Sequence, residues 1–211
     1  MQVKKFTFNP FQENTFILFD DTKECLIVDA GCYFPEEFVQ LKKFIEENDL
    51  VPQKLISTHS HLDHVFGNHI VTKELKLQLG IHPEDEQTLK MLKTTADLYQ
   101  VPNVFESPEP DFYFEHGDTI KFGKSELEVR FVPGHAPGHV VFVDHKDSLV
   151  INGDCLFAGS IGRTDLPGGD HATLLKSIQE QLFTLPDEYV VYCGHGPETT
   201  VGDEKRTNPF F

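Results

Sequence analysis

Four potential metal ligands lie within six consecutive positions of this sequence, in the segment Thr58-His59-Ser60-His61-Leu62-Asp63-His64. Because alternate residues of an extended chain point to the same side, His59 and His61 can converge on one cation. Asp63 and His64 lie beyond a bend and can face a second cation nearby. Imidazole and carboxylate ligands together suit zinc, iron or manganese. The segment therefore predicts a metal site rather than an ordinary solvated loop.

Three later residues offer further ligands, and each lies beside glycine at the end of an expected strand. They are His135 in Pro133-Gly134-His135, Asp154 in Asn152-Gly153-Asp154 and His195 in Gly194-His195-Gly196. Glycine allows the backbone to turn sharply and to approach a site closely. Two cations need more ligands than residues 59–64 provide, so these three residues are candidates to complete the set.

The chain that must position these residues alternates between strands and helices in two cycles. In the first cycle, the patterns predict four strands and a helix that begins at Pro35. The strands are Val3–Phe8, Thr15–Asp20, Cys25–Asp29 and Leu55–Ser57. The second and third strands are expected to form an antiparallel hairpin. The second cycle begins with a helical stretch, Pro83–Tyr99, and a loop, Val101–Pro110. A series of strands from Phe112 to Asp154 follows. The cycle ends with a helix capped by Asp170 and a last strand, Tyr189–Cys193. This order predicts two sheets packed face to face with helices outside, in one domain of residues 1–211.

Composition narrows the possible partners. The net charge of −16 disfavours nucleic acid and anionic membrane surfaces. No apolar stretch is long enough for a membrane helix, and Met1–Phe8 alternates like a strand rather than like a signal peptide. The four cysteines are far apart and form no CxxC pair, so we expect free buried thiols. These features favour a cytoplasmic protein, monomeric or a small homo-oligomer, that acts on a small molecule.

The order of the motifs, THxHxDH, then PGH, then GD and then GH, resembles the metallo-β-lactamase superfamily over nearly the whole chain. More narrowly, the segment from Gly153 to Asp165 resembles the glyoxalase II-like hydrolases. The resemblance implies an α+β fold, a four-layer αβ/βα sandwich of two mixed β-sheets with helices outside. Only 16 residues (211 − 195) follow His195, so the chain resembles the short bacterial form without the helical C-terminal domain.

The resemblance also implies roles for individual residues. One metal would be bound by His59, His61 and His135, and the other by Asp63, His64 and His195. Asp154 would bridge the two metals, and Asp29 in Asp29-Ala30-Gly31 would support the site from behind. Arg163 falls where the family has a basic residue near glutathione; alternatively, it is a surface residue or pairs with Asp165.

The implied activity is that of a metal-dependent hydrolase with two divalent cations, zinc before iron or manganese. A metal-bound hydroxide would attack the carbonyl of S-lactoylglutathione or a related acyl thioester, with Asp63 and Asp154 as catalytic residues. The alternatives are a persulfide dioxygenase with one iron and a lactonase. A β-lactamase is disfavoured because those enzymes are exported, and an inactive binding domain because all seven ligand candidates are present.

The remaining histidines are not expected to be ligands. His139 lies four positions after His135, but the family pattern has its ligand at PGH. We expect His69, His82 and His145 to be surface or packing residues, and His171 to lie at a helix start. Cys155 and Cys193 adjoin candidate ligands but should point the other way along their strands.

Overall fold

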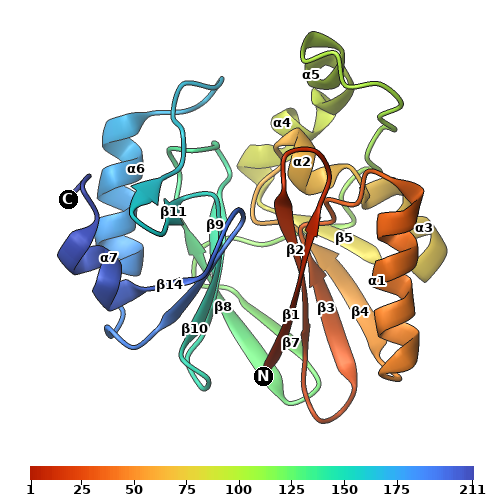
Figure 1. The fold of residues 1–211 in the computed structure, drawn as a ribbon, viewed down its shortest axis with the longest axis horizontal. Coiled ribbons are helices and arrows are strands. Elements are labelled where there is room, and N and C mark those ends of the chain that lie inside the picture. Colours follow the sequence, from red (N-terminus) through yellow and green to blue (C-terminus); the bar gives the residue numbers. More distant parts are fainter.

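Two six-stranded β-sheets form the centre of the computed structural model, which describes residues 1–211 (Figure 1). The first sheet has the order β1-β2-β3-β4-β5-β6. Its strands are β1 (Gln2–Phe8), β2 (Glu13–Phe19), β3 (Glu24–Val28), β4 (Val51–Ile56), β5 (Gln78–Ile81) and β6 (Phe112–Tyr113). Strands β1 to β3 pair antiparallel and β3 to β6 pair parallel, so the sheet is mixed.

The second sheet has the order β14-β13-β10-β9-β8-β7 and is also mixed, because β10 and β13 are parallel. Its strands are β7 (Thr119–Phe122), β8 (Ser125–Phe131), β9 (Val140–Asp144), β10 (Leu149–Gly153), β13 (Val190–Cys193) and β14 (Thr199–Thr200). A separate small hairpin consists of β11 (Leu156–Phe157) and β12 (Ser160–Ile161).

Helices cover the outer face of each sheet (Figure 1). Those that follow strands of the first sheet are α1 (Pro35–Glu47), α2 (Leu62–Val65), α3 (Asn68–Leu75), η1 (Pro83–Asp85), α4 (Glu86–Lys90) and α5 (Leu92–Leu98). The second sheet is covered by α6 (His171–Ser177), the π-helical η2 (Ile178–Leu182) and α7 (Val201–Thr207). The result is the predicted four-layer αβ/βα sandwich.

Local sequence explains the main elements. Pro35 occupies the first turn of α1, and the Glu37 carboxylate accepts hydrogen bonds from the backbone N–H groups of Tyr33 and Phe34. Leu41 and Ile45, which are four positions apart, are buried on the inner face of that helix. The predicted hairpin is also confirmed, since β2 and β3 pair antiparallel.

Three apolar clusters hold the layers together. The cluster between the two sheets includes Phe16 and Leu26 from the first sheet and Phe142 and Val129 from the second. The other two clusters lie between each sheet and its own helices. Phe142 is completely buried, so its replacement by alanine should cost about 3–5 kcal/mol of unfolding free energy.

The prediction that Tyr189–Cys193 is the last strand is wrong. Strand β14 follows it and pairs antiparallel with β13, placing Val190 opposite Thr200. A two-residue strand is too short to show alternation in sequence. Thr200 then caps α7 by accepting a hydrogen bond from the Asp203 N–H. The sequence analysis also missed α2, α3 and β5, which are four to eight residues long.

The four cysteines are free and buried, as predicted. Burial raises the pKa of the Cys193 thiol to about 12, which leaves it protonated and unreactive at neutral pH. None of the helices has the length and apolar character needed to cross a lipid bilayer.

Candidate metal centre

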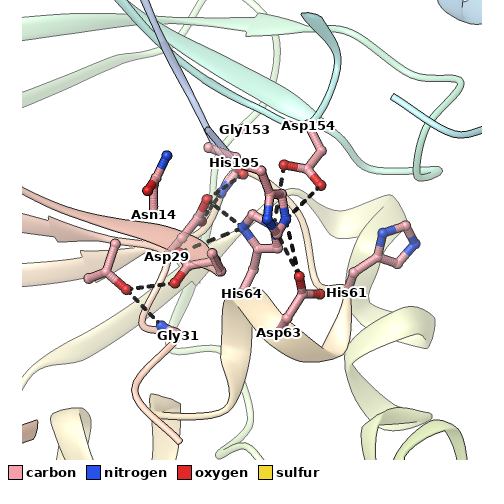
Figure 2. Close-up of polar contacts among 12 residues, drawn as sticks. Asn14, Asp29, Gly31, His61, Asp63, His64, Gly153, Asp154 and His195 are labelled. Carbon is pink, nitrogen blue, oxygen red and sulfur yellow. Dashed lines mark hydrogen bonds and ion pairs between the residues drawn. The ribbon is translucent and has the colours of Figure 1, made fainter. Parts of the chain in front are cut away.

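The seven predicted ligands lie together in the structure, although they come from both sheets. Figure 2 shows five of them, His61, Asp63, His64, Asp154 and His195. We call the seven residues the His–Asp cluster; they are His59, His61, Asp63, His64, His135, Asp154 and His195. Four of them follow β4, His135 lies between β8 and β9, and the last two follow β10 and β13. Strand ends from the two sheets therefore bring residues separated by up to 132 positions (195 − 63) into contact.

Glycine is required at two of these strand ends. Gly153 has a φ of 53°, a left-handed conformation that glycine adopts without strain. A side chain at Gly194 would overlap the Asp154 carboxylate. The glycines that marked these positions in the sequence thus allow the backbone to approach the cluster.

One part of the cluster consists of His59, His61 and His135. The His61 Nδ1 lies 2.9 Å from the His135 Nε2, which in turn lies 3.3 Å from the His59 Nε2. The His135 Nδ1 donates to the Arg163 carbonyl at 2.8 Å, so its Nε2 carries a lone pair. Imidazole nitrogens this close need a proton or a cation between them.

A second part consists of Asp63, His64 and His195 (Figure 2). The Asp63 Oδ2 lies 3.2 Å from the His195 Nε2 and 3.8 Å from the His64 Nε2. The His195 Nδ1 donates to the backbone carbonyls of Phe11 and Gln12 at 3.1 and 3.2 Å. This leaves the His195 Nε2 facing the two carboxylates of the cluster.

Asp154 contacts histidines of both parts, and Figure 2 shows its carboxylate facing His64 and His195. Its Oδ1 is 3.4 Å from the His64 Nε2, and its Oδ2 is 3.3 Å from the His195 Nε2 and 3.7 Å from the His135 Nε2. One carboxylate therefore reaches histidines of both parts, which is the position that a bridging ligand needs.

Asp29 lies behind His64, completely buried. Its Oδ2 accepts hydrogen bonds from the His64 Nδ1 at 3.0 Å and from the Thr58 hydroxyl at 2.6 Å. Its Oδ1 accepts the Thr58 backbone N–H at 2.7 Å. The Thr58 hydroxyl is then free to accept from the His59 Nδ1 at 3.1 Å. Asp29 thus orients two histidines of the cluster, directly and through Thr58.

Burial and charge set the protonation of these groups. Burial and the neighbouring imidazoles keep the pKa of His59 well below its usual range, and that of His61 at about 3. Burial alone would raise the pKa of Asp63, but the charge on His64 outweighs it and lowers that pKa. Burial opposes a charged His64, yet Asp154 and Asp63 raise its pKa. The metal-free cluster therefore combines ionised carboxylates and neutral His59 and His61 with a protonated His64, whose proton a bound divalent cation would replace.

Two orphaned atoms support the same conclusion. The His64 Nε2 and the Asp154 Oδ1 are buried and have no hydrogen-bond partner. Buried polar atoms in proteins nearly always have a partner, because leaving one unsatisfied costs about 1–3 kcal/mol. A cation bound between these atoms would satisfy both, so the residues present fit a metal.

The residues that hold the His195 loop were not predicted from the sequence. Asn14 donates from its side chain to the carbonyls of Cys193 and Gly196 at 2.9 and 3.0 Å. Glu13 is completely buried, accepts from the Thr15 hydroxyl and lies 3.9 Å from the His64 Nδ1. The one signal in the sequence is a polar Glu13-Asn14-Thr15 at the start of an otherwise apolar strand.

The other histidines lie outside the cluster. The His139 Nε2 accepts the backbone N–H of Asp154 at 3.0 Å, so His139 helps to fix that aspartate. His82 stacks on Phe131, as expected of a packing residue. His69 stacks on Phe105, and His145 contacts Glu128 and Tyr189. At the start of α6, Asp170 provides the cap and His171 is the first helical residue.

A pocket of about 900 Å³ opens directly over the cluster. Arg163 lines it, with its guanidinium paired to both carboxylate oxygens of Asp165 at 2.7 and 2.8 Å. The pairing that the sequence analysis kept open for Arg163 is thus present. Its role in substrate binding stays a prediction.

Comparison with known proteins now adds to this geometry. The sequence model of the metallo-β-lactamase superfamily matches residues 8–195. The chain belongs to that superfamily. It is 36% identical to the hydroxyacylglutathione hydrolase GloC of Haemophilus influenzae, over 100% of this chain and 98% of that protein. Membership supports a metallo-hydrolase that binds divalent cations through histidine and aspartate.

Two solved structures are similar to this metallo-β-lactamase superfamily member over nearly their whole length. TTHA1623 in a di-iron-bound form has a TM-score of 0.89 and 36% identity, covering 99% of this chain and 100% of that chain. The B3 metallo-β-lactamase BLEG-1 has a TM-score of 0.90 and 32% identity, covering 99% of both chains. These matches confirm the predicted fold.

Proposed function

We propose that this protein is a metal-dependent thioesterase that hydrolyses S-lactoylglutathione or a related acyl thioester. The observation that carries the proposal is the His–Asp cluster beneath an open pocket. In it, the His61 Nδ1 and the His135 Nε2 face each other, and the His64 Nε2 and the Asp154 Oδ1 have no hydrogen-bond partner. The 36% identity to a hydroxyacylglutathione hydrolase over the whole chain supports the thioester as substrate.

The residues divide between two metal sites in this proposal. His59, His61 and His135 would hold one divalent cation, Asp63, His64 and His195 the other, and Asp154 would bridge them. Zinc suits this mixture of imidazole and carboxylate ligands, and so does iron. Iron is the alternative metal, because the similar protein TTHA1623 has been solved in a di-iron-bound form.

Two bound divalent cations supply two things that acyl hydrolysis needs, a water with lowered pKa and polarisation of the carbonyl. The chain's own residues do the rest. The Asp63 carboxylate faces the space beside His195 and would accept a hydrogen bond from the attacking water, which orients it. A thiolate leaves readily because a free thiol has a pKa of about 8.5, so no separate general acid is needed.

β-Lactam hydrolysis is the second candidate. BLEG-1, a B3 metallo-β-lactamase, is 32% identical over 99% of both chains. The same cluster would serve, because opening a β-lactam also requires attack of water on a carbonyl.

Metal analysis combined with a substrate panel tests the proposal. The panel contains S-lactoylglutathione, a simple acyl thioester, a lactone and a β-lactam, and is run on metal-loaded and chelated protein. We expect metal-dependent hydrolysis of thioesters well above the other classes. Protein that carries two metals but hydrolyses no thioester would rule out a thioesterase. Preference for the β-lactam would favour the second candidate, and oxygen consumption with one bound iron would indicate a dioxygenase.

A further inference from the structure

Large apolar and aromatic side chains line part of the pocket over the His–Asp cluster. Four of them are exposed to solvent, namely Phe11 (41%), Met91 (42%), Leu98 (78%) and Tyr99 (45%). We call these four residues the apolar wall. Exposed apolar side chains gathered around one cavity are typical of a ligand-binding site, because a ligand would remove them from water.

The apolar wall lines the same pocket as five residues of the cluster, His61, Asp63, His135, Asp154 and His195. Phe11 belongs to the loop whose backbone carbonyl accepts from the His195 Nδ1 at 3.1 Å. The other three residues lie on or beside α4 and α5, which are anchored in the core by buried Leu89 and Leu92. A substrate carbonyl at the cluster would therefore have apolar side chains within reach of its substituents.

Cationic side chains are almost absent from the same pocket. Arg163 is the single lysine or arginine among the lining residues. Its guanidinium is already engaged by both oxygens of Asp165 at 2.7 and 2.8 Å. Glutathione carries two carboxylates, and recognition of carboxylates favours free guanidinium or ammonium groups. Apart from the cations proposed at the cluster, the pocket therefore offers little charge complementarity to such an anion.

From the apolar wall and the scarcity of cations, we propose that the substrate is a thioester with a large apolar group beside the thioester bond. That group would pack against Phe11, Met91, Leu98 and Tyr99 while the carbonyl lies at the cluster. The inference rests on the proposed thioesterase function and narrows its substrate. The apolar group belongs either to the acyl part or to the thiol part of the molecule.

A series of small thioesters distinguishes these two sources. Hexanoyl-N-acetylcysteamine carries the apolar chain on the acyl side, and the acetyl thioester of hexanethiol carries it on the thiol side. Acetyl-N-acetylcysteamine is the short reference, and S-lactoylglutathione is the anionic one. On the acyl arm, burial of four extra methylenes should raise kcat/KM over the short reference. On the thiol arm, a hexyl chain replaces the acetamidoethyl group, and burial of its added apolar surface should have the same effect. We expect an increase on the order of tenfold or more in at least one arm.

The variant that tests the wall is Met91→Gln with Leu98→Gln. Both positions are exposed, so the change should leave the fold intact. The matched control is Val39→Gln on α1, 62% exposed and outside the pocket. We expect the double variant to reduce the ratio of long-chain to short-chain kcat/KM to within about threefold of unity. The control should retain the full ratio.

Binding of the thioether S-hexyl-N-acetylcysteamine, which cannot be hydrolysed, provides a second readout by calorimetry. Weaker binding in the double variant but not in Val39→Gln supports the inference. Three results would overturn the inference of an apolar substrate without affecting the proposed thioesterase function. They are equal rates across the chain lengths, a higher rate for S-lactoylglutathione, and thioether binding that the double variant does not weaken. If no thioester is hydrolysed, the proposed function fails, and thioether binding alone decides whether the wall binds apolar ligands.

Discussion

The His–Asp cluster and the apolar wall face the same pocket but are built in opposite ways. In the cluster, His59 and His64 are buried and bonded through their Nδ1 atoms to Thr58 and Asp29. In the wall, the side chains of Met91 and Leu98 are apolar and exposed to solvent. Buried polar groups are costly to disturb, whereas exposed side chains change at little cost to stability. The cluster therefore determines the chemistry, and the wall is free to determine which substrate is accepted.

The largest effect is expected from Asp154→Ala. Asp154 contacts histidines of both parts of the cluster, so its loss should remove the bridge and lower metal content. Thioesterase activity should fall by on the order of a thousandfold or more. Asp21→Ala, an exposed acid paired with Lys124, is the control and should keep wild-type metal content. A fully active Asp154→Ala variant would refute the bridging role.

Asp29→Asn should have a smaller effect on metal binding, because Asp29 orients the histidines of the cluster and is not itself a proposed ligand. The amide is isosteric but cannot accept every hydrogen bond that Thr58 and His64 donate to Asp29. Loss of such support typically lowers metal affinity by about 10- to 100-fold. A competition titration with a chelator measures this affinity. Asp20→Asn, a buried aspartate bonded to Thr22 and Ser125 away from the cluster, should leave it unchanged. Equal affinities in both variants would contradict the role of Asp29.

Metal affinity should also depend on pH. Burial opposes a charged His195, but hydrogen bonds to Asp154 and Asp63 raise its pKa from 6.5 to about 10 in the metal-free protein. A metal must displace that proton, so affinity should increase as pH rises from about 6.5 to about 10, by about tenfold per pH unit for each proton released. Conversely, the metal-free protein should lose stability over this range, because the raised pKa stabilises the fold only while His195 is protonated. Affinity that is flat or falls with pH would contradict this coupling.

Much of the cluster could be predicted because its residues are marked locally. The segment 59–64 concentrates four ligand types, and glycines accompany His135, Asp154 and His195. The residues that hold the cluster in place could not be predicted in the same way. Asn14 contacts Cys193 from 179 positions away, and Phe11 acts through a backbone carbonyl that carries no sequence signal.

The fold shows the same division between local and distant information. Long periodic elements such as α1 were predicted, because alternation and periodicity extend over many residues. Short elements such as α2 and β14 were not, since they form only when distant strands position them. The apolar wall was missed for a related reason: Met91 and Leu98 fall within a helical stretch whose buried and exposed faces both carry leucine or methionine.

The smallest effect is expected from Arg163→Gln, on the boundary between the two regions. The guanidinium is exposed and paired with Asp165, and the contact to His135 uses the backbone carbonyl, which the variant keeps. The KM for S-lactoylglutathione should change by no more than about threefold. An increase of tenfold or more would show that Arg163 binds a substrate carboxylate, and would weaken the case for an apolar substrate.

The central claim is that the cluster holds two cations that act together in thioester hydrolysis. The most direct test adds zinc stepwise to chelated protein while the loss of thioester absorbance is followed. We expect activity to be absent in the chelated protein, to rise with added zinc and to saturate at two equivalents per chain. Activity that saturates at one equivalent, or that persists without metal, would contradict it.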